Sequence, residues 1–226
     1  MWVFRLPHWV YLGLAPLIAV LGTFLYFDIS GDDAARAQAL KQQAPAAVLI
    51  ENFDPAKNVS EADEVTIVAQ LDLASMSEVV RKKRSSERGR TTFGLLYSTT
   101  AEAPNGKAPG MVVIEGSVTD EELAKLMVGA GKFGPILKFN GTIGADSGKG
   151  SETDMATEKT QGLADNAVYI TPFMKGRAVD LAPRGNAGGT LGFLLMVAGA
   201  LAAFGWLRLS QKRKAEQAFA KQGFGV

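Results

Sequence analysis

The sequence predicts a membrane α+β protein in which two transmembrane helices flank one extracytoplasmic, mostly antiparallel β-rich domain. We expect this domain to be a small sheet or open barrel with one or two short helices. Two uncharged apolar stretches, residues 9–27 and 188–207, predict the transmembrane helices. Each is close to the ~20 residues that a helix needs to cross a ~30 Å hydrocarbon core. Between them, short β-capable stretches alternate with turn-forming residues, which favours strands over helices.

The first apolar stretch follows a short N-terminal segment, residues 1–8, which we place at the cytoplasmic membrane interface. The alternative to a transmembrane helix is a cleaved signal peptide. Arg5 is the only Lys or Arg ahead of the stretch, and the apolar run exceeds the usual ~7–15 residues. We therefore expect an uncleaved anchor. Pro16 either kinks this helix or marks its entry at the membrane interface. Aromatic residues typical of the membrane–water interface border it at both ends: Trp2, Phe4, Trp9, Tyr11, Tyr26 and Phe27.

The second apolar stretch leads into a basic tail, residues 208–226. Five basic residues stand there against one acidic residue, so the tail carries a net charge of +4. Subtracting the tail and Arg5 from the chain's net +1 leaves −4 for residues 28–187. Positive flanks tend to stay in the cytoplasm. Both termini are therefore predicted to be cytoplasmic, in an inner, cytoplasmic-type membrane, with the domain in the periplasm or its equivalent.

Residues 28–187 are predicted to form the extracytoplasmic domain. We expect a neck helix over 33–43, which Asp32 caps and Pro45 ends. A strand or a short helix is expected over 77–84. Runs of β-branched and aromatic residues predict further strands at 46–53, 65–71, 91–99, 111–118, 136–143 and 168–173.

Local signals add detail to this domain. Thr119 stands three residues before Glu122, the spacing of a capping box, and predicts a helix that Gly129 ends. The dipeptide Asn140-Gly141 predicts a tight hairpin turn. Residues 144–162 are rich in Gly, Ser, Thr and acidic residues, and they predict a long loop.

Both apolar stretches carry small residues at spacings that let helices approach closely. Neither stretch contains an Asp, Glu, Lys, Arg or His, which argues against a transport or proton path. We therefore expect the two helices to anchor the protein and to pack against helices. The residues of these predicted packing faces are Ala15, Ala19, Gly188, Gly192, Gly199 and Ala203.

Residues suited to catalysis are scarce. The chain has no Cys, and its single His, His8, stands beside the first apolar stretch. A His- or Cys-based nucleophile or metal site is thus excluded from residues 28–187. The G-x-G-x-x-G pattern at 129–134 follows a predicted helix instead of a strand, and the P-loop-like stretch 144–150 has the wrong spacing. We expect no enzymatic activity, cofactor, metal or small-molecule substrate. The enzymatic alternatives that remain are a Ser–Lys hydrolase and chemistry by paired carboxylates.

A basic stretch is the sharpest chemical feature of the predicted domain. It runs from residue 81 to 90 and holds six positive charges against Glu87, in a domain that is otherwise acidic. Two interpretations stay open: a solvated loop, or a docking site for an acidic partner or anionic lipid headgroups. Nucleic acid is not expected on this side of the membrane. The basic residues are Arg81, Lys82, Lys83, Arg84, Arg88 and Arg90.

The order of helix, outer β-rich domain and helix resembles that of the surfeit-locus assembly factors of cytochrome oxidase. The resemblance is one of topology, and it implies a role in assembling a membrane complex. Together with the scarcity of catalytic residues, it leads us to expect a non-catalytic accessory or assembly subunit of a larger integral membrane complex, respiratory or electron-transferring. The alternative is a membrane-anchored sensor or binding module whose outer domain takes a ligand.

Overall fold

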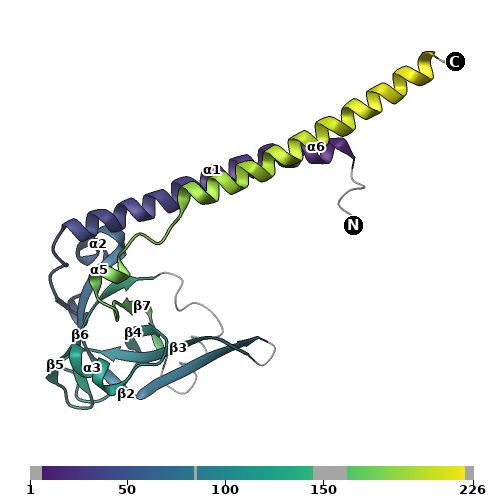
Figure 1. Cartoon of the computed structure of the whole chain (residues 1–226). Coiled ribbons are helices and arrows are strands. Elements are labelled where there is room, and N and C mark those ends of the chain that lie inside the picture. Colours follow the sequence, from purple (N-terminus) through teal and green to yellow (C-terminus); the bar gives the residue numbers. More distant parts are fainter. Residues whose placement is uncertain (1–6, 84–85, 145–161, 222–226) are drawn as a thin grey trace. The chain divides into compact units, whose positions relative to one another are not determined.

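The computed structural model describes residues 7–83, 86–144 and 162–221, except for the side chains of 81–83, 86–88 and 220–221. The chain divides into two compact units. The helical unit comprises Met1–Ala34 and Pro183–Val226, and the barrel unit comprises Ala35–Ala182 (Figure 1). The predicted architecture is confirmed at this level: two long apolar helices, near the two ends of the chain, flank a mixed seven-stranded sheet.

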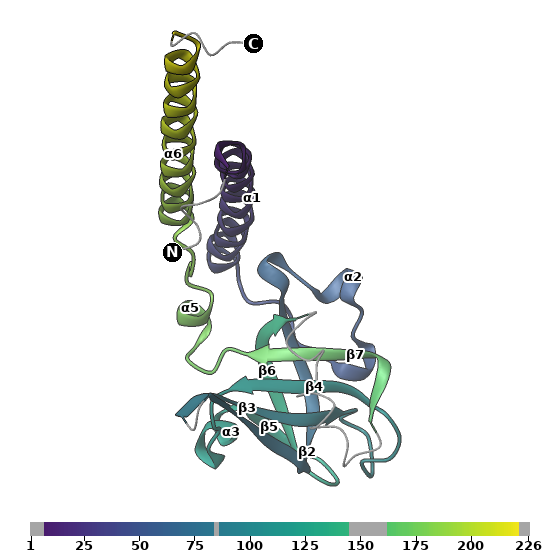
Figure 2. The same ribbon diagram turned by 90° about the vertical axis from the view of Figure 1, so that its right-hand side faces the viewer.

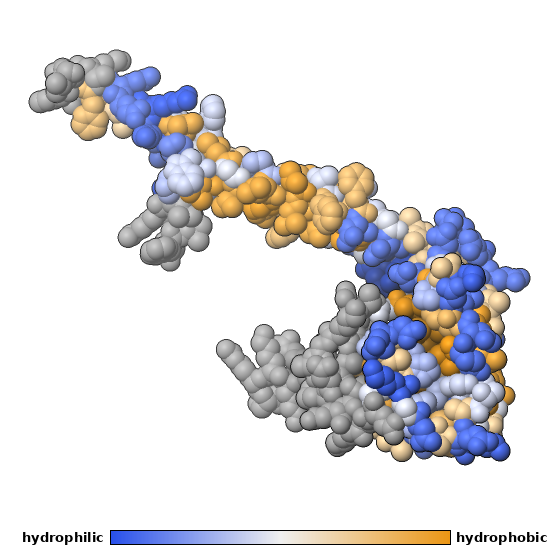
Figure 3. Space-filling model, turned by 180° about the vertical axis from the view of Figure 1, so that it is seen from behind, coloured by the Kyte–Doolittle hydropathy of each residue, from blue (hydrophilic) through white to orange (hydrophobic). Residues whose placement is uncertain are grey.

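The two long helices are α1 (His8–Lys41) and α6 (Ala187–Lys221). By length and composition, both are apolar enough to span a membrane. Figure 3 shows apolar side chains gathered along the middle of the helices and polar ones towards the C-terminal part of α6. The separate neck helix expected over 33–43 is wrong, because α1 runs without interruption to Lys41. No Pro breaks residues 28–41, and a capping residue such as Asp32 does not by itself start a new helix.

Small residues let α1 and α6 pack closely in the helical unit. Tyr11 and Ala15 on α1 and Ala198 on α6 are buried. A Cβ on Gly22 would lie 3.0 Å from the Cβ of Leu194, so a larger side chain would push the helices apart there. The interface therefore follows the close-approach principle expected of membrane helices.

The barrel unit is built on seven strands: β1 (Val48–Leu49), β2 (Glu64–Lys83), β3 (Ser86–Tyr97), β4 (Ala108–Glu115), β5 (Met127–Ala130), β6 (Pro135–Ile143) and β7 (Leu163–Pro172). Its short helices are η2 (Ile50–Asn52), α2 (Pro55–Asn58), η3 (Glu61–Asp63), α3 (Asp120–Leu126) and α5 (Arg177–Asp180). The strand predicted at 46–53 is shorter in the structure, where β1 covers Val48–Leu49. At 77–84 the sequence allows a strand or a short helix, and the described residues 77–83 form the end of β2.

Five of the strands close into a ring (Figure 2). The order is β2-β3-β4-β7-β6, and β6 returns to pair with β2. The β4–β7 pairing is parallel and the other four around the ring are antiparallel. With α3 between its third and fourth strands, this ring has the connectivity of the five-stranded Greek-key barrel called the OB-fold.

A bend in β2 makes the closure possible. Residues 64–70 of β2 pair with β6, and the pairing with β3 begins at Gln70 and is interrupted between Asp72 and Ser77. At this bulge the hydroxyl of Ser75 donates to the Asp72 carbonyl at 2.7 Å and accepts the Leu95 N–H at 2.9 Å. The side chain thus replaces a lost ladder bond, and the bulge lets one strand serve both sides of the barrel.

Two apolar clusters pack on opposite faces of the ring. The main core draws Ile67, Leu96, Phe139 and Ile170 from four of its strands, so it fills the interior. A second cluster uses alternate residues of β3 and of the second half of β4, which point outwards because strand side chains alternate between faces, together with Ala108 at the start of β4. It consists of Phe93, Leu95, Tyr97, Ala108, Met111 and Val113.

Two local signals have opposite outcomes. The capping box is confirmed: Thr119 Oγ1 accepts the Glu122 N–H at 3.3 Å, and Glu122 Oε2 accepts the Thr119 N–H at 2.9 Å. The bonds that the Thr119 N–H and, at 3.0 Å, the Thr119 hydroxyl donate to this carboxylate lower the pKa of Glu122. The hairpin turn at Asn140-Gly141 is wrong, since both residues lie inside β6. A Cβ on Gly141 would lie 2.2 Å from the Thr171 carbonyl oxygen, so the glycine serves the approach of β7.

Candidate functional site

The predicted basic stretch lies on the β2–β3 hairpin and not in a loop. Arg81 pairs with Gly89 and Lys83 with Ser86 across the hairpin. The β3–β4 pairing starts only at Thr91, and β6 pairs with β2 only up to Gln70. Among the described residues, the segment beyond Val80 is therefore a two-stranded ribbon, and it projects past the rest of the sheet (Figure 1). We call residues 80–90 the basic hairpin.

Only part of this hairpin is described in side-chain detail. Arg90 Nη1 lies 2.6 Å from Glu78 Oε1, a pair between two half-exposed side chains on neighbouring strands. Arg84 lies outside the described residues, as do the side chains of Arg81, Lys82, Lys83 and Arg88. The backbone pairing nevertheless places Arg81, Lys82, Lys83, Arg88 and Arg90 on the two strands of one ribbon.

A buried ion pair joins β2 to α5. Arg177 donates a hydrogen bond to each carboxylate oxygen of Glu64, from Nε to Oε1 at 2.7 Å and from Nη2 to Oε2 at 2.9 Å. The Glu64 side chain is 1% exposed and that of Arg177 is 23% exposed. Asn140 donates its amide to Glu64 Oε1 at 2.9 Å. Three donors thus satisfy a carboxylate that burial alone would disfavour.

The same guanidinium holds the last turn of α1. Arg177 donates to the carbonyl of Ala39 at 2.6 Å and to that of Gln42 at 3.1 Å. The final carbonyls of a helix have no partner within it, so a cation there satisfies them and opposes the helix dipole. The hydrogen bonds to Glu64 raise the pKa of Arg177. We call Arg177, Glu64, Asn140 and these two carbonyls the Arg177 clasp. Its geometry suits a structural role, in which one guanidinium links β2, α5 and the end of α1.

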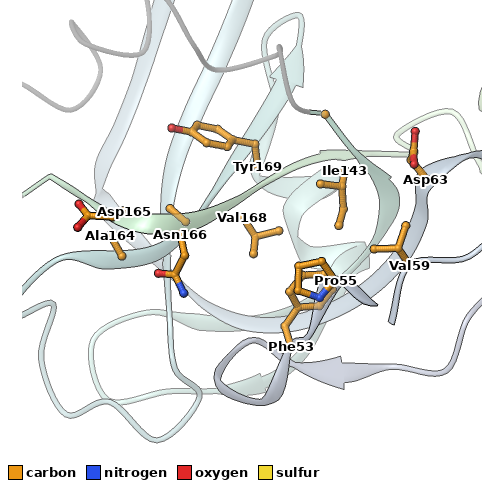
Figure 4. Close-up of a pocket in the computed structure, with 12 residues that line it drawn as sticks. Phe53, Pro55, Val59, Asp63, Ile143, Ala164, Asp165, Asn166, Val168 and Tyr169 are labelled. Carbon is orange, nitrogen blue, oxygen red and sulfur yellow. The ribbon is translucent and has the colours of Figure 1, made fainter. Parts of the chain in front are cut away.

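A pocket of about 410 Å³ opens at the side of the barrel, between the segment 53–63, the end of β6 and the start of β7. In Figure 4, Val59, Ile143 and Val168 face a common centre, with Phe53 and Pro55 closing one side. Asp165, Asn166 and Asp63 lie at its margins. The volume falls within the roughly 300–1,000 Å³ of sites that bind small ligands. No sequence pattern predicts this pocket, because its walls come from separate segments.

The predicted packing residues of the helices fall into two groups. Ala15 is buried in the α1–α6 interface, and Ala19 is half-buried. On α6, Cβ atoms built on Gly188, Gly192 and Gly199 meet no atom within 4 Å, and Ala203 is exposed. Close approach to α1 instead uses Gly205, whose Cβ would lie 2.9 Å from Leu12. We call Gly188, Gly192, Gly199 and Ala203 the open face of α6.

The glycine pattern at 129–134 has a packing explanation. Gly129 and Ala130 belong to β5, so Gly129 does not end α3, which stops at Leu126. Cβ atoms on Gly131 and Gly134 would lie 1.4 Å from Gln70 Oε1 and 2.0 Å from the Leu71 carbonyl oxygen. These glycines therefore let the β5–β6 turn press against β2.

No protein-family model, no curated protein and no solved structure matches the chain. Within the described ranges, no group of three or more His, Asp or Glu side chains is placed to hold a metal ion. Most of the predicted loop at 144–162, including the P-loop-like stretch, lies outside the described residues. The basic hairpin, the pocket and the open face of α6 are thus the candidate functional surfaces.

Proposed function

We propose that this protein is a non-catalytic accessory or assembly subunit of a larger integral membrane complex, with the basic hairpin as a docking element for an acidic surface of a partner. The observation that carries the proposal is the hairpin itself. An isolated two-stranded ribbon is marginally stable in water, and concentrated positive charge adds self-repulsion. A ribbon of this kind that projects past its sheet is stabilised when an oppositely charged surface covers it.

The membrane arrangement supports the same role. We propose that α1 and α6 both cross an inner, cytoplasmic-type membrane, with both termini in the cytoplasm and the barrel unit outside. Support comes from the length and composition of the helices and from the +4 tail against the −4 of residues 28–187. A cytoplasm-dependent reporter should be active after Val226 and inactive when inserted near Asn105; the reverse pattern contradicts this orientation.

Charge reversal of the hairpin tests the docking function. Replacing Lys82, Lys83 and Arg84 with Glu should release the protein from its complex, and more readily at high salt, because a Debye length of ~8 Å screens the charges that remain. Each exposed ion pair contributes only ~0–1 kcal/mol, so the three changes are needed together. The measurement is the yield of co-purifying proteins after native extraction of the tagged chain.

A matched control separates docking from net charge. Lys125, Lys138 and Lys175 are exposed elsewhere on the barrel unit, and their replacement by Glu changes the net charge by the same amount. The control variant should keep its partners. Equal yields from the hairpin and control variants would show that the hairpin is only a solvated ribbon. Loss of binding to vesicles with anionic lipids, with protein partners retained, would assign the hairpin to lipid headgroups instead.

A second candidate function is a membrane-anchored binding module. The pocket of about 410 Å³ favours it, because its size and its mixture of apolar walls and polar margins suit a ligand. OB-fold barrels also include binders of oligosaccharides and oligonucleotides, although a shared fold does not specify a ligand. Binding of a small molecule that leaves partner co-purification unchanged would favour this second candidate.

A further inference from the structure

The floor of the pocket is an opening in the main core. Phe53, Val59, Ile143 and Val168 line the pocket, and all four also pack against the core cluster inside the barrel. Each is only partly buried, so apolar surface continuous with the core faces solvent at this place. A ligand with an apolar group would complete the packing there, since burial of such surface is favourable.

One wall of the pocket is an irregular bulge in β7, larger than the usual one-residue insertion. Ala108 of β4 pairs with Leu163, and Gly110 pairs with Val168, so four residues of β7, 164–167, stand opposite Pro109 alone. Proline has no N–H to donate. The β4 ladder therefore leaves backbone donors and acceptors of the bulge without a β4 partner. An extended peptide, unlike a small hydrocarbon ligand, can use such backbone groups as well as the apolar floor.

The charged groups at the margin are acidic. Asp63 and Asp165 line the pocket together with Asn166, and no Lys or Arg is among the described lining residues. Lys107 reaches Asp165 from outside the lining at 3.1 Å, as a pair in which the Asp165 side chain is 96% exposed. Exposed pairs of this kind are weak and exchange readily. The margin thus favours a cationic group next to the apolar one.

The backbone that presents Asp63 is strained. Ala62 and Asp63 adopt left-handed conformations, with φ of 58° and 56°, which residues other than glycine rarely adopt. Glu64 follows directly and is fixed by Arg177 at 2.7 Å. The Arg177 clasp therefore holds in place a turn that is unfavourable by itself, and strain of this kind is concentrated at binding sites.

We propose that this pocket binds a peptide segment of a partner protein that presents an apolar side chain beside a Lys or Arg. The apolar side chain fills the opening above Ile143 and Val168, and the cation lies near Asp63 and Asp165. The inference rests on the proposed function, because it names a second contact through which the protein holds its partner.

Binding of synthetic peptides to the full chain in lipid discs tests the proposal. The probes are blocked pentapeptides of sequence Gly-Lys-Phe-Lys-Gly, Gly-Glu-Phe-Glu-Gly and Gly-Lys-Ala-Lys-Gly, followed through the Ile143 methyl NMR signal. Only the first should shift this signal strongly. Val59→Trp, which fills the pocket, should weaken binding of the first peptide about tenfold or more. Val179→Trp is the matched control, since Val179 is 58% exposed and lies outside the lining, and it should leave binding unchanged.

Asp63→Asn keeps the test valid if the Val59 variant does not fold. Asn tolerates the left-handed conformation, so only the charge is lost, and we expect binding about two- to fivefold weaker. Asp120→Asn on α3 should have no effect. Equal binding of the three peptides, or equally tight binding of phenethylamine, would overturn the proposal. Because Lys82, Lys83 and Arg84 take no part in peptide binding, failure of the pocket and failure of the docking hairpin give different results.

Discussion

Glycines serve opposite purposes in the two units of the molecule. In the barrel unit, Cβ atoms on Gly134 and Gly141 would lie 2.0 Å and 2.2 Å from backbone oxygens, so these positions are filled from within the chain. In the helical unit, Gly192 and Gly199 on α6 meet nothing within 4 Å. The comparison teaches that Gly134 and Gly141 are needed for the barrel's own packing, whereas the open face of α6 remains available to something outside the chain.

Charge follows the same division. The barrel unit contains a complete ion pair between Glu64 and Arg177, whereas residues 9–27 and 188–207 of the helices contain no Asp, Glu, Lys, Arg or His. Changes in the barrel should therefore alter the stability of the protein itself. Changes on the open face of α6 should alter what the protein binds.

The largest effect is expected at the Arg177 clasp. Replacing Arg177 with Met leaves Glu64 buried and without its cation, which should cost about 3–5 kcal/mol of the barrel's free energy of unfolding. Replacing both residues with Met removes the unpaired charge and should restore most of the loss. Hydrogen exchange of β2 amides in the full chain measures both variants. Lys175→Met on the exposed surface serves as control and should change stability by less than about 0.5 kcal/mol.

The pH dependence of the clasp follows from the pKa of Arg177. Because Glu64 raises this pKa in the folded protein, the stabilisation is fully present below the pKa of the unfolded state and is lost only as pH rises through the folded value. Both values lie far above neutrality. The difference between the wild type and the variant with Met at both positions should therefore stay constant across roughly pH 6–9, because that variant keeps no buried carboxylate to titrate. A difference that disappears within this range would contradict the pairing.

A smaller loss is expected from Gly134→Ala. The new methyl group would lie 2.0 Å from the Leu71 carbonyl oxygen, so the β5–β6 turn must shift, at a cost of about 1–3 kcal/mol. Gly129→Ala is the matched control, because its methyl would meet Ile136 at an ordinary 3.7 Å. Urea unfolding of the two variants compares them directly. Equal midpoints would show that the barrel glycines are no more constrained than those of α6.

The parts of this fold that depend on neighbouring residues could be predicted from the sequence. The apolar helices follow from local hydropathy, and the capping box follows from Thr119 and Glu122 three positions apart. A similar local signal, the dipeptide Asn140-Gly141, predicted a turn that does not form, because long-range contacts with Glu64 and Thr171 determine the structure there. Local propensity gives way to tertiary contacts in such cases.

Long-range features had no sequence signal. Arg177 and Glu64 are 113 residues apart, and the ring closes by pairing residues 64–70 with 136–142. The pocket forms only when the ring is closed, because its lining residues come from segments on either side of that pairing. The basic stretch was visible as charge, but its placement on a projecting hairpin depends on how far β4 and β6 extend along their neighbours. Charge and hydropathy can be read residue by residue, whereas pairing cannot.

The smallest effect on stability, and the sharpest test of the comparison, concerns α6. Gly192→Leu adds a side chain where nothing lies within 4 Å, so the α1–α6 pair should remain intact, with stability changed by less than about 0.5 kcal/mol. Gly205→Leu should separate the helices, because its Cβ would lie 2.9 Å from Leu12. The chain has no Cys, so cysteines introduced at Gly22 and Leu194 report the pairing by their disulfide yield.

The two leucine variants should then differ in a second measurement. If the open face of α6 packs against a helix of a partner, as its small residues predict, Gly192→Leu should keep the cross-link and lose co-purifying membrane proteins. Gly205→Leu should lose the disulfide cross-link between positions 22 and 194, because it separates α1 from α6. Retention of every partner by the Gly192 variant would mean that this face meets only lipid, where small residues have no packing role. The contrast between glycines that pack against the chain itself and glycines with nothing beside them would then not extend to partner binding. Docking would depend on the barrel unit alone.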